Sequence, residues 1–183
     1  STAITPLIAE SDAQNDKNKT KSILSNGIII CSILGLILTA LVLIFKPIIY
    51  YMGQPEIVVS LAYPYITLVA ISLFPLIVFQ SFKQFSDGLS FTKIAMISTV
   101  IANIINVILN YILIYGEFGF PRLELVGAGI GTLISRFIMV LLIIYLIKSN
   151  SKTNQYINNL FSFEYSSKII KKIFNLGYPS ALQ

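Results

Sequence analysis

The sequence predicts an all-α protein that crosses a membrane several times. Of its 183 residues, 55% are hydrophobic and only 11% are charged, and the mean hydropathy is +0.79. Soluble domains carry about 25% charged residues, so this composition excludes an ordinary globular protein. Several apolar runs of about 20 residues or more are long enough to cross a bilayer as helices, which predicts a polytopic membrane protein.

Four complete spans are expected, and a polar or Gly/Pro-rich break follows each of them. About 20 residues at 1.5 Å per residue cover a hydrocarbon core of about 30 Å. The spans are 22–45, 57–79, 94–115 and 125–147. Residues 1–9 have the composition of the end of a membrane helix, and the last residues, LGYPSALQ, that of the start of another. We therefore expect the chain to be a fragment of a longer protein.

The distribution of lysines predicts the orientation in the membrane. Loops 10–22, 80–93 and 148–172 lie on one side and hold ten lysines, whereas the other two loops hold only Lys46 and Arg122. The positive-inside rule assigns the lysine-rich side to the cytoplasm. Because the lysines fall between apolar runs and not on one face, the net charge of +5 does not predict a nucleic-acid partner.

Several kinds of chemistry are not expected from this composition. The chain has no histidine, and its single cysteine, Cys31, lies inside an apolar run. This excludes a disulfide framework and makes the usual zinc and haem sites very improbable. No pair of carboxylates lies within the spans for acid–base work, and no Ser/His/Asp arrangement is present. We expect no cofactor and no enzymatic activity.

The third span carries a stripe of polar residues. At 100° per residue, Thr99, Asn103, Asn106 and Asn110 fall within an arc of about 60° on one face. The stripe could supply hydrogen bonds between helices, or it could line a water-filled cavity that coordinates an ion or a solute. From spacing alone, interhelical hydrogen bonding is favoured.

The fourth span contains an arginine and a set of small residues. Arg136 lies near the middle of the span, where an arginine costs about 2.5–3.5 kcal/mol, so it should face protein or water. It could pair with helix-end carbonyls or a loop acid such as Asp87, or it could act in function, and both readings stay open. Gly127, Gly131 and Ser135 are four residues apart, a pattern typical of close helix packing.

Five motifs, in order along nearly the whole chain, closely resemble the multidrug and toxic compound extrusion (MATE) family of transporters, in particular its bacterial NorM-like branch. The motifs are YYMGQPE, FQSFKQFSDGLSFTK, NIINVILNYILIYGEFGFP, LVGAGIGTLISR and KKIFNLGYPSALQ. The resemblance implies twelve membrane helices in two lobes of six. Residues 1–172 would then form part of the N-terminal lobe, from the end of helix 2 to the loop after helix 6. Residues 173–183 would start helix 7.

The resemblance also implies a function. A member of this family would export cationic, amphipathic compounds in exchange for Na⁺ or H⁺, as a monomer in the bacterial cytoplasmic (inner) membrane. Its partners would be small-molecule substrates, the coupling cation and the lipid bilayer.

The resemblance implies that one cation site of the family's N-terminal lobe would lie at Asn106, Asn110 and Thr132 of this chain. Asn110 stands where some members have an aspartate, which weakens the expected cation binding. Tyr65 is the implied match for a tyrosine that lines the same cavity, and we add Asn103 and Arg136 to the expected substrate cavity. With the family in view, cavity lining becomes the favoured interpretation of the polar stripe.

Two other functions are kept open. One is a flippase for lipid-linked oligosaccharides from the same superfamily, which would need several basic residues in its cavity. Only Arg136 lies within a predicted span, and this disfavours the flippase. The other is a membrane scaffold or remnant that transports nothing.

Overall fold

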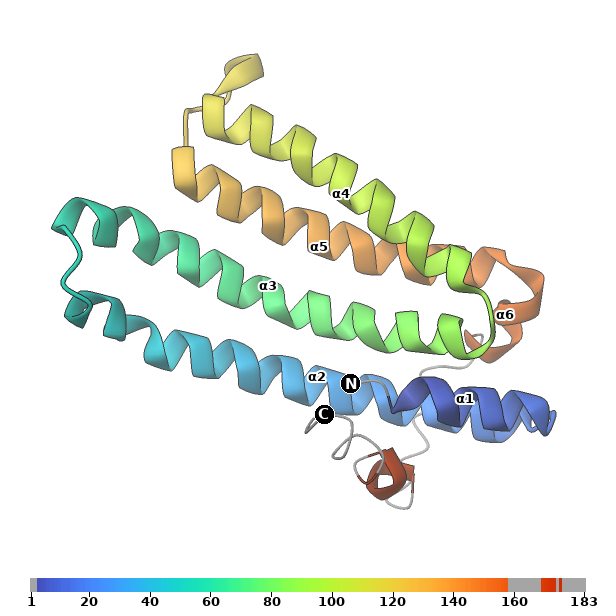
Figure 1. Cartoon of the computed structure of the whole chain (residues 1–183). Helices are drawn as coiled ribbons and strands as arrows, with labels where there is room; N and C mark the ends of the chain where they lie inside the picture. Colours follow the sequence, from blue (N-terminus) through green and yellow to red (C-terminus); the bar gives the residue numbers. More distant parts are fainter. Residues whose placement is uncertain (1–2, 158–168, 174, 176–183) are drawn as a thin grey trace.

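The computed structural model describes residues 3–157, 169–173 and 175. Within these residues the chain forms helices and no strand, so the all-α fold is confirmed (Figure 1). Four helical segments of the described residues are long and apolar enough to cross a membrane. They are α2 (Lys17–Phe45) with its continuation η1 (Lys46–Tyr51), α3 (Glu56–Gly88), α4 (Thr92–Tyr115) and α5 (Glu124–Ser149). The protein is therefore a multi-pass membrane protein.

Short helices lie at the ends of the spans. α1 (Ile4–Ala13) packs beside the start of α2 and the end of α3, η2 (Glu117–Gly119) joins α4 to α5, and α6 (Ser151–Ile157) follows α5. The Asp16 carboxylate accepts a hydrogen bond from the Lys19 N–H at 3.0 Å, and this N-cap fixes where α2 begins. The expected start of a further helix at 173–183 lies almost entirely outside the described residues.

The spatial order of the four long helices differs from their order in the chain. α5 lies between α3 and α4, and α2 covers the other side of α3 (Figure 1). Glycines permit this close approach: a Cβ on Gly127 would lie 2.6 Å from the Leu113 carbonyl oxygen, and Gly131 lies directly against Asn110. The interpretation of these small residues as a packing face is confirmed.

α3 is longer than the span predicted at 57–79, because it continues to Gly88 through most of the expected loop 80–93. Contacts with α1 explain the extension. The Gln84 side-chain oxygen accepts a hydrogen bond from the Ile4 N–H at 3.2 Å, and Ile8 lies against Gly88. These contacts bury the last turns of α3, which a local reading of this polar sequence does not anticipate.

The buried apolar core is concentrated at the end of the bundle that the lysines predict to be cytoplasmic. Leu24, Phe85, Ile143 and Ile147 are fully buried there, next to Ile8 of α1. Elsewhere the outer faces of the long helices carry exposed, large apolar side chains. Such faces suit contact with lipid or with further protein.

Candidate functional site

A polar cavity of about 360 Å³ lies between α3, α4 and α5. Both polar and apolar side chains form its walls. They are Leu76, Phe79, Gln80, Lys83, Thr99, Ala102, Asn103, Asn106, Thr132, Ser135, Arg136 and Met139. Its volume falls in the lower part of the range of about 300–1,000 Å³ that is typical of small-molecule sites.

Three members of the polar stripe of α4 line this cavity. The Asn106 side-chain amide also donates a hydrogen bond to the Ser135 hydroxyl of α5 at 3.0 Å. The Asn103 side chain is exposed and has no hydrogen bond to the described residues, whereas Thr99 donates to the Ala95 carbonyl at 2.9 Å. The stripe therefore does both things considered from the sequence: it lines a cavity and it joins two helices.

Asn110, the last residue of the stripe, lies outside the cavity lining. Its amide donates to the Asn106 side-chain oxygen at 3.2 Å, so the two asparagines form a pair. Its own side-chain oxygen is buried against Gly131 and has no hydrogen-bond partner in the described part of the chain. A buried acceptor without a donor is unfavourable.

Thr132 lies on the facing helix, one residue beyond Gly131, and lines the cavity. Its hydroxyl donates to the Ala128 carbonyl at 2.8 Å, which leaves the hydroxyl oxygen able to accept or to coordinate. Of the three predicted cation ligands, Asn106 and Thr132 line the cavity. Asn110 lies outside the lining and is hydrogen-bonded to Asn106. Among the described residues, no group of His, Cys, Asp or Glu side chains could hold a metal ion.

Arg136 has a partner that the sequence did not indicate. Its Nη1 donates to the Ser72 hydroxyl of α3 at 2.6 Å, and that hydroxyl donates to the Val69 carbonyl at 2.7 Å. The expected structural pairing with helix-end carbonyls or with Asp87 is therefore corrected: the partner is a hydroxyl in the middle of a helix. In the described part of the chain, no carboxylate is within ion-pair distance of Arg136.

Lys83 of α3 is a cavity residue that sequence reasoning missed, and Gln80 lines the same cavity. At 100° per residue, Ser72, Leu76, Gln80 and Lys83 fall within an arc of about 80°. The sequence shows this alignment only if residues 80–88 are helical, and they fall in the predicted loop 80–93. Lys83 is half-buried and forms no hydrogen bond or ion pair with any described residue.

Tyr65 is not among the side chains that line the polar cavity. It lies at the contact between α3 and α5, where a Cβ on Gly129 would be 3.4 Å from its ring carbon Cδ2. Of the three expected substrate residues, Asn103 and Arg136 share the cavity and Tyr65 packs elsewhere.

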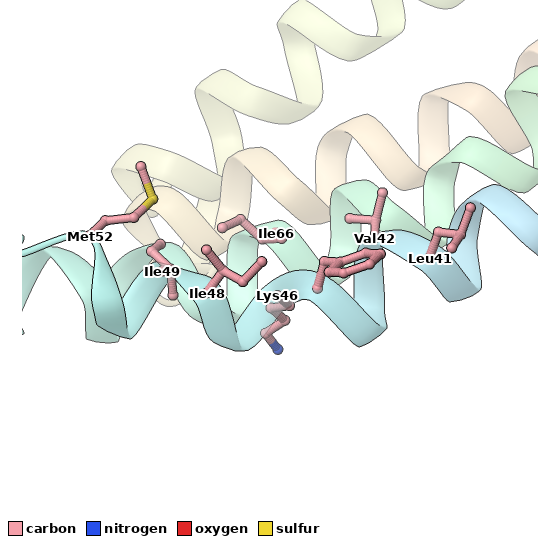
Figure 2. A pocket seen from close by; sticks show the side chains of 8 residues that line it. Leu41, Val42, Lys46, Ile48, Ile49, Met52 and Ile66 are labelled. Carbon is pink, nitrogen blue, oxygen red and sulfur yellow. The ribbon is translucent and has the colours of Figure 1, made fainter.

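A second hollow, of about 510 Å³, lies where α2 and η1 meet α3, and its walls are almost entirely apolar (Figure 2). Its one charged residue is Lys46, whose amine points away from the other labelled side chains (Figure 2). This amine donates to the Thr67 hydroxyl and lies 3.2 Å from the centre of the Tyr63 ring. The lysine therefore has partners within its own bundle.

The chain is similar to several known proteins. Residues 1–112 match the sequence profile of the MatE family. A probable multidrug resistance protein NorM of Photorhabdus laumondii is 32% identical over 176 residues, which cover 96% of this chain and 38% of that protein. The multidrug resistance protein NorM of Vibrio cholerae is 29% identical over 180 residues, which cover 98% of this chain and 39% of that protein.

One matching solved structure is described as the inward-facing conformation of a multidrug resistance MATE family transporter of the MOP superfamily. It aligns with a TM-score of 0.84 and 27% identity over 99% of this chain and 40% of that one. The chain spans about two-fifths of the length of the curated relatives it matches. The solved structure is that of a transporter.

Proposed function

The chain belongs to the MatE family, and from that premise we propose that it works as part of a multidrug efflux transporter. In this proposal the transporter exports cationic, amphipathic compounds in exchange for Na⁺ or H⁺, and it does so as a monomer. Support comes from the NorM relatives, which are multidrug resistance proteins, and from the likeness to an inward-facing transporter of the family.

The observation that carries the coupling proposal is the asparagine pair of α4. Asn110 has a buried side-chain oxygen without a donor, directly behind Asn106, and Thr132 lies on the neighbouring turn of α5. Amide and hydroxyl oxygens are reasonable ligands for a hard cation such as Na⁺. Because all three are neutral, we expect weak binding that saturates only at high cation concentration.

Cation binding would act by shifting a conformational equilibrium. A cation that contacts both α4 and α5 favours the state in which these helices lie close together, and it has no such effect on a state in which they separate. Asn106 already bridges to Ser135 of α5, so a bound cation would strengthen an existing contact. Export would follow from the difference in cation concentration between the two sides of the membrane.

The proposed setting is the cytoplasmic membrane of a bacterium, with loops 10–22, 80–93 and 148–172 on the cytoplasmic side. The lysine distribution supports this orientation. No carboxylate of the described residues lines the polar cavity, so we expect the acid that attracts a cationic substrate to lie elsewhere in the transporter.

The test is gradient-driven efflux from liposomes that contain the intact protein and a fluorescent cationic dye. We expect efflux to need an inward Na⁺ or proton gradient. Asn110→Ala should lower the initial rate about 10-fold, and Asn110→Asp should lower the cation concentration needed for half-maximal rate. Ile108→Ala, an exposed position on the opposite face of α4, is the matched control and should leave the rate unchanged.

Two results would contradict these proposals separately. Efflux that ignores both gradients would overturn coupled export. Gradient-driven efflux that Asn110→Ala leaves intact would remove the asparagine pair from the coupling site and leave the transport function standing.

A further inference from the structure

We propose that the polar cavity between α3, α4 and α5 binds an oxyanion, such as the carboxylate, sulfonate or phosphate group of an amphipathic molecule. The charges of its walls point to this chemistry. Among the described residues, two cationic side chains, Lys83 and Arg136, line the cavity, and no Asp or Glu does. This inference goes beyond cation-coupled export, because oxyanion binding needs neither a gradient nor the asparagine pair.

Both cations have donors to spare. Lys83 has no hydrogen bond or ion pair with any described residue, so all three of its N–H donors are free of protein partners there. Arg136 has five N–H donors and uses Nη1 on the Ser72 hydroxyl, which is a neutral acceptor. Neither side chain has its charge balanced by the described part of the protein.

The nearby acids do not supply the missing negative charge. Asp87 follows Lys83 by one helical turn, yet it neither lines the cavity nor lies within ion-pair distance of Lys83. Glu10 at the same end of the bundle already pairs with Lys19 at 3.1 Å and with Lys172 at 3.2 Å. An anionic ligand in the cavity would therefore supply the oxygens that Lys83 and Arg136 lack.

The remaining walls specify an amphipathic ligand. The Gln80 and Asn103 side chains have no hydrogen bond to described residues and can donate N–H groups to the same oxyanion. Leu76, Phe79 and Met139 supply an apolar surface beside them. Two like charges in a partly buried space attract an oxyanion, and charge-assisted hydrogen bonds to such oxygens are strong and short.

Access is expected from the predicted cytoplasmic end. Lys83 lies five residues before the end of α3, whereas Arg136 lies at the middle of α5. At 1.5 Å per residue, the face from Ser72 to Lys83 extends about 16 Å along α3. The oxyanion would first meet Lys83 and then reach Arg136. Its source is either a soluble organic anion or the headgroup of an anionic lipid, which present the same oxygens.

The test is equilibrium binding of a fluorescent naphthalenesulfonate to the intact protein in phosphatidylcholine nanodiscs, followed by fluorescence anisotropy. We expect saturable binding that Lys83→Gln and Arg136→Gln each weaken at least about 10-fold, because each removes a charge-assisted contact. Lys93→Gln is the matched control: it removes a cation from the same end of the bundle, at an exposed position outside the cavity, and should leave binding unchanged.

Two further measurements keep the proposal falsifiable. Arg136→Lys retains the charge and should retain most of the binding, whereas a loss as large as that of Arg136→Gln would show that the ligand does not recognise the charge. Replacing part of the phosphatidylcholine with phosphatidylglycerol separates the two sources. Competition by phosphatidylglycerol assigns the site to a lipid headgroup, and undiminished binding assigns it to a soluble anion.

The proposal is overturned if the wild-type protein does not bind the sulfonate, or if Lys83→Gln and Lys93→Gln bind it equally. Failure here would leave gradient-driven efflux unaffected. Failure of the efflux test would likewise leave this binding measurement intact.

Discussion

Lys46 and Lys83 each line a hollow of the helical bundle, but their surroundings differ. The hollow at Lys46 is apolar, and the amine is held by the Thr67 hydroxyl and the face of the Tyr63 ring. The cavity at Lys83 is polar, contains a second cation, and gives the amine no partner among the described residues. The amine of Lys46 therefore has partners within the protein, and the amine of Lys83 is available to a ligand.

This difference shows that a charged side chain in a membrane protein indicates a ligand site only when it has no partner within the protein. A cation–π contact of this kind is worth about 0.5–2 kcal/mol, so Lys46 contributes to the packing of η1 on α3. Lys83 makes no such contribution within the described residues. The polar cavity is therefore the region where a ligand is expected, although it has the smaller volume of the two.

Of the changes that test this difference between the two lysines, placing an acid in the polar cavity should have the largest effect. Gln80→Glu puts a carboxylate one turn before Lys83 on the same face of α3, so the cavity gains a partner for its cations. We expect sulfonate binding to weaken by more than 10-fold. Gln80→Leu, which adds no charge, should weaken it less, and equal losses in the two variants would mean that shape and not charge controls binding.

Removing the partner of Arg136 should have a moderate effect on stability. Ser72→Ala deletes the hydroxyl that accepts from Nη1, and we expect the free energy of unfolding to fall by about 1 kcal/mol. Titration of the purified protein with sodium dodecyl sulfate, followed by circular dichroism, measures this change. Ser72→Thr keeps the hydroxyl and should lie close to wild type. A Ser72→Ala protein as stable as wild type would show that the Ser72 hydroxyl contributes nothing to holding Arg136.

Releasing Lys46 should have a smaller effect. Tyr63→Leu removes the ring beneath the amine and should lower the free energy of unfolding by about 0.5–1 kcal/mol.

Acetylation followed by mass spectrometry also reports on the two lysines. In wild type we expect Lys83 to react faster than Lys46, and in the Tyr63→Leu, Thr67→Val double variant the two rates should approach each other. Similar rates in wild type would remove the contrast between the two regions.

The smallest effect on stability is expected at Glu10, a solvent-exposed carboxylate that pairs with two lysines. Hydrogen bonds from Lys19 and then from Lys172, together with their charges, hold the pKa of the Glu10 carboxyl below its ordinary value of 4.5. A lowered pKa in the folded state means that the stabilisation is present above pH 4.5 and is lost as the pH falls through the folded value. Because the carboxyl is exposed, the contribution is small.

Thermal unfolding of wild type and Glu10→Gln between pH 3 and pH 7 tests this prediction. The wild type should melt slightly higher at neutral pH, and the two curves should converge in acid. A difference that grows as the pH falls would have the opposite sign and would exclude this pairing as the cause.

Much of the fold could be read from the sequence because it depends on local properties. The apolar runs specify four spans, the lysines between them predict an orientation, and the spacing of Gly127 and Gly131 specifies a close helix contact. The stripe from Thr99 to Asn110 follows from helical periodicity alone. Arg136 is likewise recognisable as an exception, because a charge inside an apolar run requires protein or water around it.

Only the tertiary structure decided which of these residues meet. α5 lies between α3 and α4, so Arg136 reaches Ser72, which is 64 residues earlier in the chain. α1 packs on the end of α3 and keeps residues 80–88 helical, which turns Lys83 from a predicted loop residue into a cavity residue. Hydropathy and periodicity describe one helix at a time. The partners of a buried polar group depend on the order and rotation of neighbouring helices, which local sequence does not encode.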